Sequence, residues 1–177
     1  MPTILTKSDE KYFVWIDQMR NIILAICIVL AHKAYAVEEC DLLGSLEADP
    51  FSISEPVNFQ DIKSTRLVKA CTEATEEQNN NVARHYLLRA RGHLCDGSNE
   101  QAITDIRNSH DMGYLAATFA LATLYHFGDA MPQDLVKAAS LYEAAYNNGV
   151  TWAVRGLAIL YEGSGVDNYN PELVQEW

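Results

Sequence analysis

One spacing of residues recurs in this chain at an interval of 36 positions. The repeated residues are alanine, leucine, tyrosine and glycine, and they pair Ala117 with Ala153, Leu121 with Leu157, Ala122 with Ala158, Tyr125 with Tyr161 and Gly113 with Gly149. A fixed period of this size is typical of an α-solenoid, in which each helical pair buries its apolar face only against neighbouring pairs. The repeat therefore predicts an all-α fold made of antiparallel helix pairs.

The central copy of the repeat predicts two helices with clear ends. Small and apolar residues at i, i+3, i+4 and i+7 spacing indicate a first helix from about Tyr114 to Phe127, which Gly128 ends. A second helix should begin after Gln133 or Asp134, because either side chain can accept hydrogen bonds from the free amides of a first turn. This helix should continue to about Asn147, where Asn and Gly follow as a stop signal.

The same copy carries a recognisable motif. It reads Ala117-x-x-x-Leu121-Ala122-x-x-Tyr125-x-x-Gly128, then Asp134-x-x-Lys137-Ala138-x-x-Leu141-Tyr142-x-x-Ala145, then Gly149. This spacing resembles the Sel1-like repeat, a relative of the tetratricopeptide repeat, although Leu141 and Ala130 stand where that family commonly has an aromatic residue and a second loop glycine. The resemblance implies a short α-solenoid over residues 81–177, with copies at about 81–113, 114–149 and 150–177.

The third copy is expected to be incomplete, because only the start of its second helix, from Pro171 to Trp177, is present. Leu173, Val174 and Trp177 would then lack the polar capping helix that usually covers a solenoid end. We therefore expect self-association through this copy. The two interpretations of this end are a truncated product and a short helix that folds back as a modest cap.

An export signal is predicted ahead of the repeats. Met19 and Arg20 precede an apolar stretch from Ile22 to Ala31, and Ala34 and Ala36 form a small-x-small site. These are the three regions of a signal peptide in order, so residues 1–36 are interpreted as a leader that is cleaved after Ala36. The mature chain is expected to be periplasmic or secreted, without stable membrane insertion.

Two alternatives concern this leader. The apolar stretch could be a membrane anchor, but it has about half of the ~20 residues needed to cross a hydrocarbon core. Residues 1–18 carry Asp9, Glu10 and Asp17 where a signal peptide has positive charge. Either Met19 is the true start, or a long acidic leader is tolerated.

The cysteines predict one disulfide in an exported chain. Residues 37–80 form a loop-rich segment that contains Cys40 and Cys71, and the third cysteine beyond the leader is Cys95. A Cys40–Cys71 bridge would stabilise this segment by about 3–4 kcal/mol in the chain-entropy model. The alternative is three free thiols. Cys95 is expected to be a small buried apolar residue rather than a reactive thiol.

Composition and motifs argue against several function classes. The net charge is −11, which disfavours nucleic acid as a partner. The only Ser-x-x-Lys motif, Ser8 to Lys11, falls in the leader, and no motif for metal, phosphate or dinucleotide binding is present. We therefore expect a protein without cofactor or metal that is not an enzyme. The alternative is a weak β-lactam-binding or hydrolytic protein of the cysteine-rich Sel1-like type, although copies two and three lack the cysteines of those relatives.

The resemblance also implies where a partner binds. In tetratricopeptide-type solenoids the first helix of each pair lines the concave face, which partners occupy. Carried over, this predicts Arg84, Leu87 and Arg91 in copy one, Phe119, Thr123 and His126 in copy two, and Trp152, Arg155, Ile159 and Glu162 in copy three. The predicted function is an exported scaffold that binds another protein, with regulation of a periplasmic or cell-envelope partner as one form of it.

Overall fold

The computed structural model describes residues 15, 18–20, 39–77 and 80–164. The chain divides into two units, Met1–Tyr35 and Ala36–Trp177. In the first unit, residues 15 and 18–20 are helical. The expected cleavage after Ala36 and the expected end of the third repeat, at residues 165–177, lie outside the described residues.

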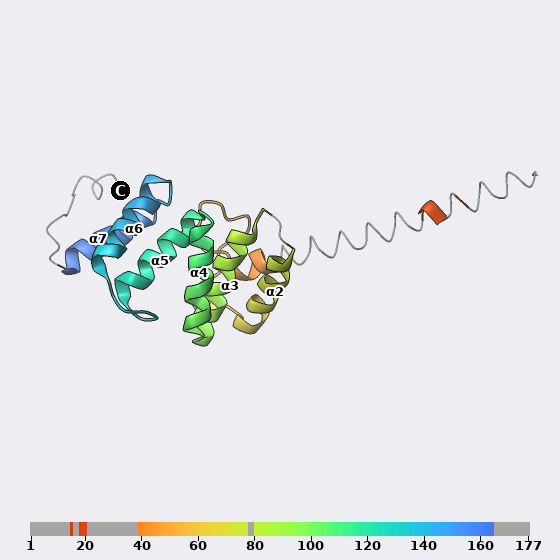
Figure 1. Cartoon of the computed structure of the whole chain (residues 1–177), viewed down its shortest axis with the longest axis horizontal. Coiled ribbons are helices and arrows are strands. Elements are labelled where there is room, and N and C mark those ends of the chain that lie inside the picture. The colour runs from red at the N-terminus through yellow and green to blue at the C-terminus, as the bar shows by residue number, and fades with distance from the viewer. Residues whose placement is uncertain (1–14, 16–17, 21–38, 78–79, 165–177) are drawn as a thin grey trace, which may run out of the picture. The chain divides into compact units, whose positions relative to one another are not determined.

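The described part of the second unit is helical and contains no strand. After a helical turn at 39–44, the elements are the short η1 (Phe59–Asp61) followed by α2 (Ser64–Glu76), α3 (Val82–Asp96), α4 (Asn99–Asp111), α5 (Leu115–Phe127), α6 (Leu135–Asn147) and α7 (Ala153–Ser164) (Figure 1). The all-α class predicted from the sequence is confirmed. Within the described residues, none of the helices is long and apolar enough to span a membrane.

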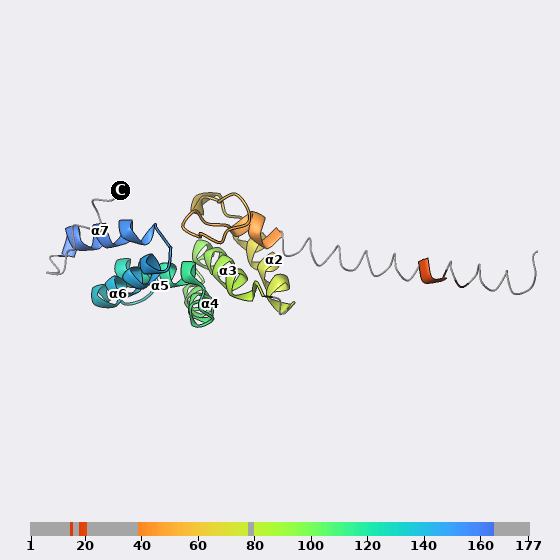
Figure 2. The ribbon, with the colours of Figure 1, turned by 90° about the horizontal axis from the view of Figure 1, so that it is seen from above.

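Consecutive helices of this unit pack against one another. α3 lies against α4 and α5 against α6, and α2, α4 and α6 each also contact the next helix along the chain. In addition, α3 contacts α5, and α5 contacts α7. Figure 2 shows the loop at residues 45–58 beside α3, and α5, α6 and α7 follow as neighbours further along the chain, with α5 in contact with α4.

The helix ends of the central copy agree with the sequence predictions. Gly128 follows α5 with a φ of 73°, a left-handed conformation that favours glycine. At the start of α6, Asp134 Oδ1 accepts a hydrogen bond from the backbone amide of Lys137 at 3.0 Å. Asp134 is therefore the N-cap, while Gln133 donates instead to the carbonyl of His126.

The core consists of two clusters. The larger cluster runs from α3 to α7 and is rich in alanine, whose small side chain lets neighbouring helices approach closely. Five of its alanines are 0% exposed: Ala116, Ala117, Ala122, Ala138 and Ala145. The smaller cluster lies under the loop-rich segment and is built around Leu67, Leu88 and the cysteines of a disulfide. α3 contributes to both clusters, with Leu87 in the larger one and Leu88 in the smaller one.

The disulfide joins Cys40 to Cys71, with the two Cα atoms 4.8 Å apart. Both residues are fully buried. The pairing predicted from the sequence is therefore present. Cys95 is free and only partly buried, and its Sγ lies 3.9 Å from the carbonyl oxygen of Ile62, so it is less enclosed than we expected.

Candidate functional site

A groove with a volume of about 330 Å³ opens between α5 and α7, and α6 contributes to its lining. Its lining residues are Phe119, Thr123, Phe127, Tyr142, Trp152, Arg155, Gly156 and Ile159, and we call it the α5–α7 groove. Five of them are among the partner-binding residues predicted from copies two and three: Phe119, Thr123, Trp152, Arg155 and Ile159. Because α5 contacts α7, the structure brings together residues that are up to forty positions apart in the sequence.

The most buried residue of the lining is Tyr142, which is 1% exposed, and we call its ring the floor of the groove. Its centroid lies 5.7 Å from that of Phe119, and its hydroxyl donates to Thr123 Oγ1 at 3.3 Å. The Nδ1 atom of His126 lies 3.3 Å from the same hydroxyl. Because the hydroxyl proton is directed at Thr123, the compatible arrangement has the Nδ1 of His126 protonated and donating to the Tyr142 oxygen.

These floor groups are uncharged near neutral pH. Burial raises the pKa of Tyr142 above its usual value near 10, so the phenol keeps its proton. Burial lowers the pKa of His126, so its imidazole stays neutral. The floor therefore offers a ligand apolar surface without a formal charge.

The rim of the groove is more exposed and includes one cation. The side chains of Phe127 and Ile159 are 51% and 53% exposed, so the rim presents two large apolar side chains to solvent beside the groove. Phe127 stacks on His126, with ring centroids 4.4 Å apart. The guanidinium of Arg155 lies over the Trp152 ring, 4.7 Å from its centroid.

Two further predicted residues lie near this groove but do not line it. His126 is buried behind Tyr142, where its ring supports the floor and is 7% exposed. Glu162 is exposed on α7, beyond the groove-lining residues of that helix.

The three residues predicted from copy one lie elsewhere and are engaged within the chain. Leu87 is 1% exposed and belongs to the larger core cluster. Arg84 is buried and forms a bidentate pair with Asp41, with Nε–Oδ1 and Nη2–Oδ2 distances of 2.7 and 3.0 Å. Arg91 is partly buried, and its guanidinium is bound by backbone carbonyls.

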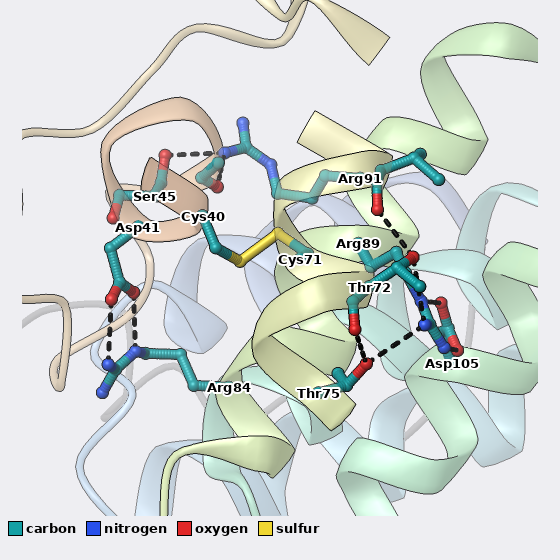
Figure 3. The surroundings of a disulfide bond; sticks show 12 residues. Cys40, Asp41, Ser45, Cys71, Thr72, Thr75, Arg84, Arg89, Arg91 and Asp105 are labelled. Atoms are coloured by element: carbon teal, nitrogen blue, oxygen red, sulfur yellow. Dashed lines mark hydrogen bonds and ion pairs between the residues drawn. A yellow bond between two sulfur atoms is a disulfide. The ribbon is translucent and has the colours of Figure 1, made fainter. Parts of the chain in front are cut away.

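Arg91 holds the loop-rich segment through backbone carbonyls. Its guanidinium donates to the carbonyls of Gly44, Ser45 and Val57, the last two at 2.6 and 2.8 Å. Burial lowers the pKa of this guanidinium to about 10. Figure 3 shows Arg91 beside Ser45 and the Asp41–Arg84 pair on the other side of the disulfide. The face of α3 that the sequence placed at a concave surface is therefore covered by residues 40–57 of the same chain.

Sequence reasoning missed three lining residues of the groove: Phe127, Tyr142 and Gly156. Tyr142 was visible as part of the repeat motif, and Phe127 as the last apolar residue before Gly128. Gly156 carried a signal of its own, since a glycine inside an apolar helical pattern indicates a close approach of a neighbouring group. A Cβ at this position would lie 2.6 Å from two ring carbons of Tyr142.

A second hollow, of about 450 Å³, lies along α3 and α4 and differs in chemistry. Arg89 and Asp105 in its lining form a bidentate pair, with both N–O distances at 2.7 Å. His93 Nε2 lies 3.9 Å from the same carboxylate. Because Arg89 and Asp105 pair with each other, their charges are already neutralised within the chain. We therefore take the α5–α7 groove as the better candidate for a binding site.

Metal ligation has no candidate in the described part of the chain, where no three His, Cys, Asp or Glu side chains group together. Comparison of the sequence and structure with protein-family models, curated proteins and solved structures gave no match. The resemblance to the Sel1-like repeat stays a prediction that depends on the spacing of the quoted residues.

Proposed function

We propose that this chain is a short α-solenoid scaffold of the Sel1-like kind and that it holds a segment of another protein in the α5–α7 groove. The observation that carries the proposal is the gathering of Phe119, Trp152, Arg155 and Ile159 around one hollow. Aromatic and arginine side chains dominate binding energy at protein interfaces. A concave apolar surface with few polar groups is also the usual form of a binding site.

The packing of alternate helices supports the solenoid interpretation. The contacts of α3 with α5 and of α5 with α7 bring the first helices of successive pairs together, as expected for stacked repeats. In tetratricopeptide-type proteins, partners bind the face that these first helices share. The position of the groove between α5 and α7, the first helices of copies two and three, supports the same use here.

The size of the groove favours a short segment of a partner over a broad globular face. A volume of about 330 Å³ lies at the lower end of the range for small binding sites, and it accommodates a few side chains. The exposed side chains of Phe127 and Ile159 would be covered on binding. Full burial of an exposed side chain of this size contributes about 1.5–3 kcal/mol. Because each of the two is about half exposed in the free protein, covering both contributes roughly that amount in total, against about 8 kcal/mol for a micromolar affinity, so the other lining residues must contribute as well.

We further propose that the scaffold acts outside the cytoplasm, in the periplasm or as a secreted protein. The signal-peptide pattern of residues 1–36 and the Cys40–Cys71 disulfide support this location, because disulfides persist in oxidising compartments. The partner would be another protein of the same compartment or of the cell envelope.

The test is affinity capture from the exported fraction with the full chain and two matched variants. Ile159→Asp places a charge on the exposed rim of the groove, while Val136→Asp places the same charge on α6 at a side chain that is 76% exposed and does not line the groove. We expect one protein to be retained by the native chain and by Val136→Asp and lost from Ile159→Asp. Equal retention by all three proteins would rule out the groove as the binding site.

A further inference from the structure

We propose that the segment bound in the α5–α7 groove presents one carboxylate side chain beside a large apolar side chain, and that Arg155 binds this carboxylate. The inference depends on the proposed function, since it specifies the chemistry of the partner at the same groove. It comes from the position of Arg155, compared with the other arginines of the described chain.

Most described arginines are engaged by oxygen atoms of the chain itself. Arg66, Arg84 and Arg89 pair with the carboxylates of Glu39, Asp41 and Asp105 at 2.6–2.7 Å, and Arg91 donates to backbone carbonyls. Arg107 and Arg155 are the exceptions: neither makes an ion pair with any carboxylate in residues 39–77 or 80–164. Of these two, Arg155 lines the α5–α7 groove, and its guanidinium lies over the Trp152 ring. Arg155 lacks an ion pair in these ranges even though the sequence has an excess of acidic residues, 24 against 13 basic ones.

The contact with Trp152 suits Arg155 for binding a carboxylate. An aromatic ring attracts the flat face of a guanidinium, and the N–H donors at the edge of the guanidinium stay available. Two parallel hydrogen bonds from that edge match the two oxygens of a carboxylate. The ring also restricts the long side chain before binding, which reduces the entropy lost when the pair forms.

The rest of the groove supplies the apolar half of the recognition. Arg155 carries the formal charge in a lining that otherwise consists of Gly156, Thr123 and apolar or aromatic side chains. The phenol of Tyr142 is neutral at physiological pH, and burial raises its pKa further. An apolar side chain of the partner would lie against Phe119 and Tyr142, with its neighbouring carboxylate at Arg155.

The surrounding charge favours a single carboxylate over an acidic tract. The chain has a net charge of −11, which repels a strongly acidic partner at long range. Glu162 is exposed on the same helix, seven residues or about 10 Å beyond Arg155, and would repel a second carboxylate there. The expected ligand therefore pairs one Asp or Glu with an aromatic or large aliphatic residue.

The experiment is selection of short random peptides displayed on phage against the full native chain, with Arg155→Gln, Ile159→Asp and Val136→Asp selected in parallel. We expect the native chain and Val136→Asp to enrich peptides with Asp or Glu beside an aromatic or large aliphatic residue. Arg155→Gln should enrich apolar peptides without the acidic preference, and Ile159→Asp should enrich neither. Far-UV circular dichroism of each variant checks that the fold is retained.

The possible outcomes separate the two proposals. Peptides that depend on Ile159 but show no acidic preference would overturn the Arg155 inference and leave the proposed function standing. Absence of any peptide that depends on Ile159 would overturn both. For an enriched peptide made in isolation, replacing its Asp by Asn should weaken binding to the native chain by about fivefold, as expected for a partly exposed charged pair. The same replacement should leave binding to Arg155→Gln unchanged, and equal losses in both proteins would contradict the pairing.

Discussion

Tyr142 of α6 and Gly156 of α7 lie so close that a Cβ atom on residue 156 would be 2.6 Å from two carbons of the Tyr142 ring. The ring is 1% exposed and is held by the hydroxyl contacts with Thr123 and His126, so it has little room to shift. This approach sets the spacing of α6 and α7 and forms the floor of the α5–α7 groove.

Replacing Gly156 by Ala should therefore destabilise the protein. In an open helix this change would stabilise by up to about 1 kcal/mol, because alanine has the higher helix propensity. Overpacking against the Tyr142 ring should outweigh that gain, since it typically costs about 1–3 kcal/mol. Thermal unfolding followed by circular dichroism should show a melting temperature lower by a few degrees.

The same substitution in a Tyr142→Leu background is its control. Removing the ring removes the obstacle, so Gly156→Ala should then be neutral or stabilising. Equal destabilisation in both backgrounds would show that the ring contact is not the cause.

Removal of the disulfide should destabilise the chain without removing the helices of copies two and three. Cys40 and Cys71 close a span of 31 positions, and the lost cross-link should cost about 3–4 kcal/mol in the chain-entropy model. The double Cys40→Ser, Cys71→Ser variant should melt roughly 10 °C lower. Cys95→Ser is the matched control and should melt close to the native chain. An unchanged melting curve for the double variant would mean that the bridge does not stabilise the fold.

Breaking the Asp41–Arg84 pair should be more damaging than removing both charges. Asp41→Asn would leave the buried Arg84 guanidinium without a carboxylate, and such a loss typically costs about 3–5 kcal/mol. Replacing the pair together, with Asp41→Leu and Arg84→Met, should cost less, because no charge is then left buried. Chemical denaturation of the single and double variants measures the difference, and a more stable single variant would contradict this account.

Acidification should destabilise the fold through His85, which is 0% exposed. Its pKa is lowered chiefly by burial and also by the charge of Arg84, while Asp41 acts in the opposite direction. A histidine with a lowered pKa in the folded state takes up its proton more readily when unfolded. Its contribution to stability is therefore complete above the unfolded pKa of about 6.5 and falls as the pH decreases from there through the folded pKa.

The measurement is the free energy of unfolding between pH 7.5 and 5 for the native chain and for His85→Gln, which does not titrate in this range. The difference between the two proteins isolates His85 from the carboxylates, which both proteins share. We expect the native chain to lose more stability than the variant on acidification. Parallel curves would show that His85 does not contribute.

Several features of the fold could be predicted from the sequence because they depend on neighbouring residues. The spacing of small and apolar residues indicated α5 and α6, and Gly128 and Asp134 marked their ends. The disulfide was predictable because the leader pattern left few cysteines to pair. The grouping of Phe119 with Arg155, and of Thr123 with Ile159, followed from the 36-residue interval, since equivalent positions of stacked pairs lie on one face.

Other features could not be predicted from local spacing. Arg84 and Arg91 occupy positions typical of a concave surface, yet their partners lie 43 and 47 residues earlier, in a loop-rich segment without periodicity. The close approach of Tyr142 to Gly156 likewise joins different helices of different copies.

The sequence by itself determined the helical class and the ends of α5 and α6, because hydrogen-bonding propensity and apolar periodicity operate within a few turns of chain. The cysteine pair was predictable on a different ground, since few cysteines remain beyond the leader pattern. Only the tertiary structure decided that the first copy is covered by its own N-terminal segment and that the open groove belongs to copies two and three. Arg91 is bound by backbone carbonyls of the N-terminal segment, whereas Arg155 lies over the Trp152 ring. This difference depends on which distant carbonyls and carboxylates the packed helices bring within hydrogen-bonding distance of each arginine.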